Sequence, residues 1–243
     1  MKMTASTRSH DQLMDDVYRH QRYFYDFTRK YYLLGRDRLI RKLALAPHER
    51  VVELGCGTAR NLICMAGQYP DARLFGLDAS SQMLETARER IQRTSLSSRI
   101  HVAHGYAEAL EPAAFGVPCF DRAIFSYSLS MIPDWRGALA AAVAGLAPGG
   151  RLHIVDFGDF TGLGSIGRAL MLGWLRLFHV EPRTTILSCF ETLPDNKEPT
   201  LGGSLEILPG RYAFIFEGSA ELSCLLLANV ADATQPPGFP TVS

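Results

Sequence analysis

The residues Glu53-Leu54-Gly55-Cys56-Gly57 form a short glycine turn that follows directly on an apolar run. Where a buried strand passes into a helix, glycines permit a tight turn and let a ligand approach the backbone, which a Cβ atom would obstruct. Asp78 follows about twenty residues later, at the end of the next apolar run, where a carboxylate can accept hydrogen bonds from both ribose hydroxyls. Together the two features indicate a site for a nucleoside-containing cofactor.

Glycine spacing and charge discriminate among such cofactors. A dinucleotide-binding fingerprint needs a further glycine where this chain has Arg60, and a P-loop needs a Gly-Lys-Ser/Thr sequence that does not follow Gly57. Glu53 places a carboxylate just under the turn, where it would repel a pyrophosphate. An acid there suits a cofactor that carries an ammonium and a sulfonium. Each feature alone has a structural alternative, namely an ordinary strand–helix turn and a helix N-cap at Asp78.

The segments around these residues alternate between strand-like and helix-like patterns. Strands are predicted at 51–54, 72–77, 99–103, 122–126 and 151–156. Helices are predicted at 61–68, 80–94 and 135–146, the last one closed by Pro148-Gly149-Gly150, and at 12–45 with an interruption at Gly35. Such alternation predicts right-handed βαβ units and a parallel sheet with helices on both faces. After Asp156 an apolar helix is expected near 162–178, followed by strands at 184–190 and 211–217 that pair as an edge hairpin.

Three motifs resemble the class I S-adenosylmethionine (SAM)-dependent methyltransferases: V-V-E-L-G-C-G-T at 51–58, the acid in G-L-D-A-S at 76–80, and Pro148-Gly149-Gly150. The resemblance covers about residues 45–217. It implies an α/β, Rossmann-like fold with a mostly parallel seven-stranded sheet and helices on both faces. It also implies SAM as the cofactor and methyl transfer as the reaction. The cofactor-binding residues that it implies are Glu53, Gly55, Cys56, Gly57, Asp78, Ala79, Tyr106 and Ala107.

Two positions depart from the family pattern. Ala59 stands where the family has a third glycine, which is a mild change at the start of a helix. Tyr106 stands where the family often has an aspartate that contacts the adenine amino group. Tyr106 can instead stack on the adenine ring or donate a hydrogen bond, with a packing role as the alternative.

The N-terminal part of the chain concentrates aromatic side chains, because five of the nine tyrosines lie between residues 18 and 32. Aromatic faces bind a methylated ammonium without needing a donated hydrogen bond. An enzyme that methylates an amine contributes mainly positioning and electrostatics, since the neutral amine itself attacks the methyl carbon. Tyr25 is therefore one candidate catalytic residue. Tyr127 is the other, because it follows the fourth predicted strand, where the family places acceptor-facing groups.

The segment Y-x-x-x-R-K-Y-Y-L-L-G-R-D at 25–37, together with E-L-G-C-G-T-A-R-N-L at 53–62, is similar to the methyltransferase of betaine-lipid synthesis. That resemblance implies stepwise N-methylation of diacylglyceryl-homoserine, a lipid acceptor, to the trimethylated betaine lipid. Two alternatives remain open. One is a C- or O-methyltransferase that acts on a quinone or another small apolar acceptor, and the other is a non-catalytic SAM-binding regulatory subunit.

Composition narrows the classes of partner. The 243 residues carry 25 basic and 25 acidic side chains, and this balance argues against a nucleic-acid partner. Five cysteines without CxxC spacing argue against a disulfide framework, and no metal site is expected. The expected organisation is an N-terminal helical lid at 1–45, a SAM-binding catalytic domain at 46–220 and a disordered C-terminal tail at 221–243.

Hydropathy predicts a cytoplasmic protein. The first residues lack the apolar core of a signal peptide, and no run reaches the roughly eighteen apolar residues of a membrane span. The helix expected near 162–178 combines apolar residues with Arg168 and Arg176, which suits contact with anionic lipid at the inner membrane surface. A buried helix over the active site or a dimer contact is the alternative. The sequence does not specify an oligomeric state.

Overall fold

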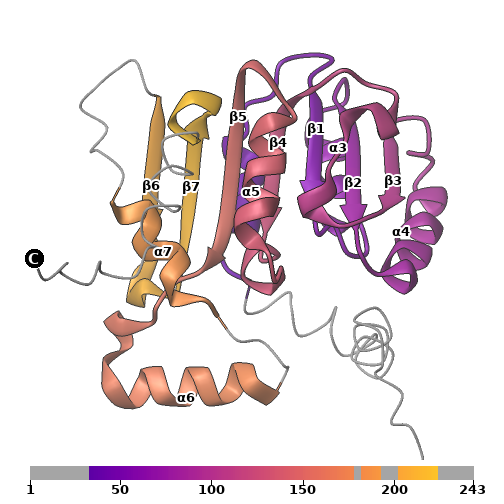
Figure 1. The fold of residues 1–243 in the computed structure, drawn as a ribbon. Coiled ribbons are helices and arrows are strands. Elements are labelled where there is room, and N and C mark those ends of the chain that lie inside the picture. Colours follow the sequence, from indigo (N-terminus) through magenta and orange to yellow (C-terminus); the bar gives the residue numbers. More distant parts are fainter. Residues whose placement is uncertain (1–32, 178–181, 193–201, 224–243) are drawn as a thin grey trace, which may run out of the picture.

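The computed structural model describes residues 33–177, 182–192 and 202–223 (Figure 1). They form one seven-stranded sheet in the order β3-β2-β1-β4-β5-β7-β6. The strands are β1 (Arg50–Leu54), β2 (Arg73–Asp78), β3 (Ile100–His104), β4 (Phe120–Ser126), β5 (Leu146–Phe157), β6 (Gly203–Ile207) and β7 (Ala213–Ser219). The first five pair in parallel, and β7 is antiparallel to both β5 and β6. The Rossmann-like methyltransferase fold that the sequence predicted is confirmed.

Helices cover both faces of the sheet (Figure 1). They are α2 (Arg36–Lys42), α3 (Arg60–Gln68), α4 (Ser81–Arg93), α5 (Trp135–Ala144), α6 (Gly164–Leu177) and α7 (Thr184–Glu191). Neighbouring strand residues point to opposite faces, so Val51 belongs to the core cluster under α2, α3 and α4, whereas Val52 belongs to the cluster under α5 and α7. Both faces are thereby buried, which is why the central strands are almost entirely apolar.

The strand order reverses at β1, which lies between β2 and β4. In open α/β sheets a crevice forms at such a point, beyond the carboxyl ends of the strands. The loops that follow β1, β2, β3 and β4 all reach this edge. The topology therefore brings together the glycine turn, Asp78 and the segment around Tyr127.

The strand predicted at 184–190 is wrong, because these residues form helix α7. The β-branched residues at its start favour a strand locally. Ile186, Leu187 and Phe190, however, recur at helical spacing and are buried in the cluster under α5. The edge hairpin exists, but its first strand is β6, which lies between the two strands that the sequence predicted.

The end of helix α5, the start of strand β5 and the end of the folded domain also differ from the prediction. Helix α5 ends at Ala144, and Pro148-Gly149-Gly150 lies inside β5, where it forms an irregularity in the pairing with β4. Gly35 interrupts the N-terminal segment as predicted: it has φ 88° and caps α2. Leu222 is buried against the core, so the folded part extends past residue 220.

In the part of the chain that the structure describes, no helix has both the length and the hydropathy to cross a bilayer.

Candidate functional site

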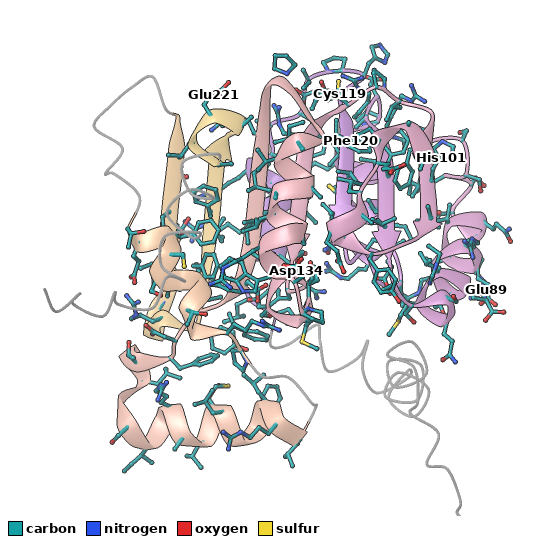
Figure 2. The ribbon with its side chains drawn as sticks, in the orientation of Figure 1. Glu89, His101, Cys119, Phe120, Asp134 and Glu221 are labelled. Atoms are coloured by element: carbon teal, nitrogen blue, oxygen red, sulfur yellow. The ribbon has the colours of Figure 1, made fainter. Side chains whose placement is uncertain are left out.

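A cavity of about 340 Å³ lies at the carboxyl edge of the sheet, where the strand order reverses. Its wall comes from the loops that follow the four strands β1 to β4. The lining residues are Gly55, Gly57, Leu77, Asp78, Ala79, Met83, Gly105, Tyr106, Ala107, Glu108, Tyr127, Ser128, Met131, Ile132, Pro133 and Asp134. Figure 2 shows Asp134 at this edge, at the opposite end of the sheet from Phe120 and Cys119.

The two glycines of the turn are required for different reasons. Gly55 has φ 74°, and a Cβ added there would lie 2.4 Å from the Cβ of Ser128, so this glycine permits close packing against the loop after β4. Gly57 has φ 54°, and a Cβ there would have no heavy atom within 4 Å. The space in front of Gly57 is thus open on the cavity side, which is the arrangement that a ligand lying against the backbone needs.

Ala59 begins α3 in the left-handed conformation, with φ 60°. A Cβ in this region costs roughly 1 kcal/mol relative to glycine. The departure from the family's third glycine therefore leaves the turn geometry in place and adds local strain.

The Asp78 carboxylate joins two loops of the cavity wall. One oxygen accepts a hydrogen bond from the N–H of Gly57 at 2.7 Å, and the other accepts from the N–H of Ser80 at 2.9 Å. The N-cap of α4 is Ser80, whose hydroxyl accepts from the N–H of Met83, so Asp78 is not the cap of that helix. A carboxylate offers about four lone-pair sites, so the hydroxyls of a ribose can share oxygens that also hold the turn.

Tyr106 and Ala107 lie on the cavity wall directly after β3, as their sequence position predicted. Ala107 is buried, while Tyr106 is about one-third exposed. The His104 ring contacts the carbonyl oxygen of Ala79 through Nε2 at 3.0 Å and so joins the ends of β2 and β3. Both loops contribute residues to the cavity wall.

Glu53 and Cys56 lie behind the turn and are not among the residues that line the cavity. Glu53 is fully buried: its Oε1 accepts from the amide of Asn61 at 2.6 Å, while its Oε2 has no partner among the described residues. Burial raises the pKa of Glu53 to about 7. The Cys56 sulfur packs against Gly76, where an added Cβ would lie 2.7 Å from it, and burial raises the pKa of this thiol. Cys56 is therefore packed in the core behind the turn.

Tyr127 lines the cavity with φ 55°, and its ring packs edge-on against Phe157 at a centroid distance of 4.7 Å. Its hydroxyl donates to the carbonyl oxygen of Leu34, and burial raises its pKa well above the usual range. The tyrosine therefore presents a fixed, neutral wall. Tyr25, the other candidate catalytic residue, lies outside the described residues.

Several lining residues were not identified from the sequence, among them Leu77, Met83, Ile132, Pro133 and Asp134. Ile132, Pro133 and Asp134 lie a few residues beyond the end of β4, and this position was the available signal. Their placement depends on Asp156, which is fully buried and accepts hydrogen bonds from both the N–H and the hydroxyl of Ser130.

A family model described as a methyltransferase domain matches residues 51–150. That region begins with β1 and contains the glycine turn, Asp78 and every residue that lines the cavity. Over these residues, which are less than half of the chain, the sequence matches a methyltransferase domain. The resemblance inferred from the motifs is confirmed at this level.

Curated relatives of this chain are named for methylation of different atoms. It is 36% identical over 124 residues to the O-methyltransferase cnsE of Penicillium expansum, an alignment that covers 49% of this chain and 44% of the relative. It is 29% identical over 202 residues to the ubiquinone/menaquinone biosynthesis C-methyltransferase UbiE of Syntrophotalea carbinolica, covering 79% of this chain and 77% of that protein. The match to this chain therefore spans less than half of the length of cnsE.

The fold is also similar to that of a SAM-dependent methyltransferase from Aquifex aeolicus, with a TM-score of 0.56 at 13% identity. The likeness covers 79% of this chain and 93% of that structure. At this identity the comparison supports the architecture.

The residues of the methyltransferase cavity fit SAM. Gly57 leaves open space beside the backbone, Asp78 supplies a carboxylate for a ribose, and Tyr106 and Ala107 would flank the adenine. The carboxyl group of Glu53, with Oε2 unpartnered among the described residues, lies behind the turn and not on the cavity wall. When bound, SAM supplies an electrophilic methyl group on its sulfonium.

Glu53→Gln is expected to remove a pH-dependent part of the free energy of unfolding. The pKa of Glu53 is raised from 4.5 to about 7 in the folded protein, so the folded state binds an extra proton between these values. Its contribution is fully present below about pH 4.5 and is lost as the pH rises through about 7, which amounts to about 3 kcal/mol. The variant should therefore gain stability relative to wild type across this interval.

Urea unfolding at a series of pH values measures this difference. Glu111→Gln, the same substitution at an exposed position, is measured beside it as the control. If Glu53→Gln differed from wild type by a constant amount, the side chain would be ionised throughout.

Proposed function

We propose that this chain transfers the methyl group of SAM to an oxygen or carbon atom of a small apolar acceptor of the quinol or phenol class. The observation that carries the proposal is the cavity at the strand reversal, with open space at Gly57 and a carboxylate at Asp78. The loop after β4 adds an apolar wall, formed by Met131, Ile132 and Pro133. That wall favours an aromatic acceptor over a strongly charged one.

The relatives favour the same acceptor class. UbiE is named for ubiquinone and menaquinone biosynthesis, and other relatives at 29% identity are demethylmenaquinone methyltransferases from Listeria species. The relative cnsE is named as an O-methyltransferase. Methyl transfer to oxygen and to carbon alike requires the acceptor to be placed in line with the sulfonium, and this is chiefly a task of positioning.

In this proposal Asp78, Gly57 and the loop after β3 hold the cofactor, while Tyr127 and Ser128 shape the acceptor side. The Ser128 hydroxyl donates to the carbonyl oxygen of Leu54 at 2.6 Å, and the Tyr127 hydroxyl is bonded to Leu34. Both side chains are therefore fixed before any acceptor enters. A rigid wall of this kind contributes by orienting the reactants and by excluding water.

The experiment that tests the proposal follows label from methyl-tritiated SAM into a panel of acceptors. Demethylmenaquinol, a plant polyphenol and diacylglyceryl-homoserine would each be offered to the purified chain. Label is expected in the quinol or the phenol, and Gly57→Val is expected to transfer none. Label in diacylglyceryl-homoserine alone, or in no acceptor, would contradict the proposal.

Amine methylation of a betaine-lipid precursor is a second candidate. The tyrosine-rich segment at 18–32 favours it, because aromatic faces suit a growing ammonium. That segment, with Tyr25, lies outside the described residues. Mono-, di- and trimethylated products of diacylglyceryl-homoserine, appearing in sequence in the same labelling assay, would support this candidate over the first.

A further inference from the structure

Helix α6 has an exposed apolar arc. Ile166, Leu170 and Leu177 are 77%, 70% and 73% exposed, which is unusual for large apolar side chains. At 3.6 residues per turn the three side chains lie within about 40° of one another around the helix axis. They form a continuous stripe, called the α6 arc here.

The opposite side of α6 is firmly packed, so the arc is not the surface of a loosely attached helix. Leu175 is buried in the core, and Met171 and Leu172 pack against the same cluster. Arg168 donates to the carbonyl oxygen of Asp159 at 2.9 Å. The Asp159 carboxylate in turn pairs with Arg211 at 2.8 Å, which fixes the start of the helix.

The charged side chains within the helix itself are both basic. From Phe160 to Leu177 the only charged residues are Arg168 and Arg176. Arg176 is exposed on one flank of the arc, and Trp174, which is partly buried and also packs against the core, lies on the other. Arginine can extend its charged end toward lipid phosphates while its aliphatic part stays in an apolar layer, and tryptophan is enriched at membrane interfaces.

The helix is connected to the cavity through aromatic contacts. Tyr127, on the cavity wall, contacts Phe157, and Phe157 contacts Phe160 just before α6. Figure 1 shows α6 beyond the carboxyl ends of the parallel strands, on the side of the sheet where the cavity lies. A surface that met the α6 arc would thus lie on the same side of the molecule as the cavity.

We infer that the α6 arc docks this methyltransferase on the surface of a bilayer that contains anionic lipid. Ile166, Leu170 and Leu177 enter the interface, and Arg176 contacts lipid phosphates. A bilayer fits better than a second protein because the exposed apolar side chains of the arc lie beside the basic Arg176, and no acidic residue occurs in the helix. Docking goes beyond the proposed methyl transfer, since it requires neither SAM nor an acceptor.

Vesicle flotation of the full chain tests the inference. The protein should float with vesicles of phosphatidylcholine and phosphatidylglycerol and should bind pure phosphatidylcholine more weakly. Leu170→Ser should lower the partition coefficient about ten-fold, because a buried leucine side chain is lost from the interface. Leu170→Ile is the matched control: it keeps the apolar area, has a helix propensity close to that of serine, and should bind like wild type.

The electrostatic part has its own pair of variants. Arg176→Gln should weaken binding about five-fold, and only to the vesicles that contain phosphatidylglycerol. Arg93→Gln, at an exposed arginine of α4, should have no effect. Absence of flotation, or equal flotation of Leu170→Ser and wild type, would overturn the inference. A dimer in sedimentation analysis that dissociates in Leu170→Ser would also overturn it, because a second copy would then cover the arc. None of these three results would change the outcome of the labelling assay for methyl transfer.

Discussion

Gly57→Val is expected to abolish SAM binding while the protein stays folded. Gly57 lines the cavity, and the space where its Cβ would lie holds no atom within 4 Å. A branched side chain would occupy the space that the cofactor needs beside the turn. It would also have to adopt φ 54°, which costs a β-branched residue roughly 1–3 kcal/mol. Calorimetric titration with SAM measures the first effect, and thermal unfolding measures the second.

Gly116→Val separates loss of the cavity from backbone strain. Gly116 has φ 69°, a Cβ there would also meet nothing within 4 Å, and it is not among the residues that line the cavity. The two variants should lose similar amounts of stability, but Gly116→Val should bind SAM like wild type. If both variants lost SAM binding together, the effect at Gly57 would be one of folding, and the turn would have only a structural role.

The core of the fold could be predicted because its signals are local. Strands β1, β2, β3 and β4 were predicted to within about two residues, since each is an apolar run between polar turns. Helix α7 was missed because its β-branched start favours a strand, while the burial of Phe190 that selects the helix depends on distant residues. Strand β6 is half-exposed and short, and its pairing with β7 has no signal within its own residues.

The residues of the site likewise fall into those that local sequence predicts and those that it does not. Gly57, Asp78 and Tyr106 could be placed because the end of a parallel strand fixes where the next residues emerge. The positions of Ile132 and Pro133 depend on a loop that Asp156 holds from another strand, which no local pattern reports. The α6 helix was predicted, but whether one of its faces stays exposed depends on what packs against it.

Asp78→Asn is expected to lower the affinity for SAM about ten- to hundred-fold, because a charge-assisted hydrogen bond to a ribose hydroxyl contributes about 1.5–3 kcal/mol. Asparagine is the informative substitution. The Asp78 carboxylate also accepts from the N–H groups of Gly57 and Ser80, and alanine would leave both donors without their partner. Asparagine keeps one acceptor oxygen and the shape of the side chain, so the loss of free energy of unfolding should stay near 1 kcal/mol.

Asp121→Asn is the matched control. Asp121 is a half-buried carboxylate that accepts from the backbone N–H and the side chain of Arg50, at the amino end of β4 and therefore far from the cavity. Its replacement should lower Tm without changing SAM affinity. A cofactor analogue whose ribose lacks both hydroxyls gives the decisive comparison. It should bind to wild type and Asp78→Asn with nearly equal affinity, because the contact that the substitution weakens is absent from the analogue. If the analogue lost as much affinity as SAM does, Asp78 would act by holding the turn at Gly57, and the ribose would be bound elsewhere.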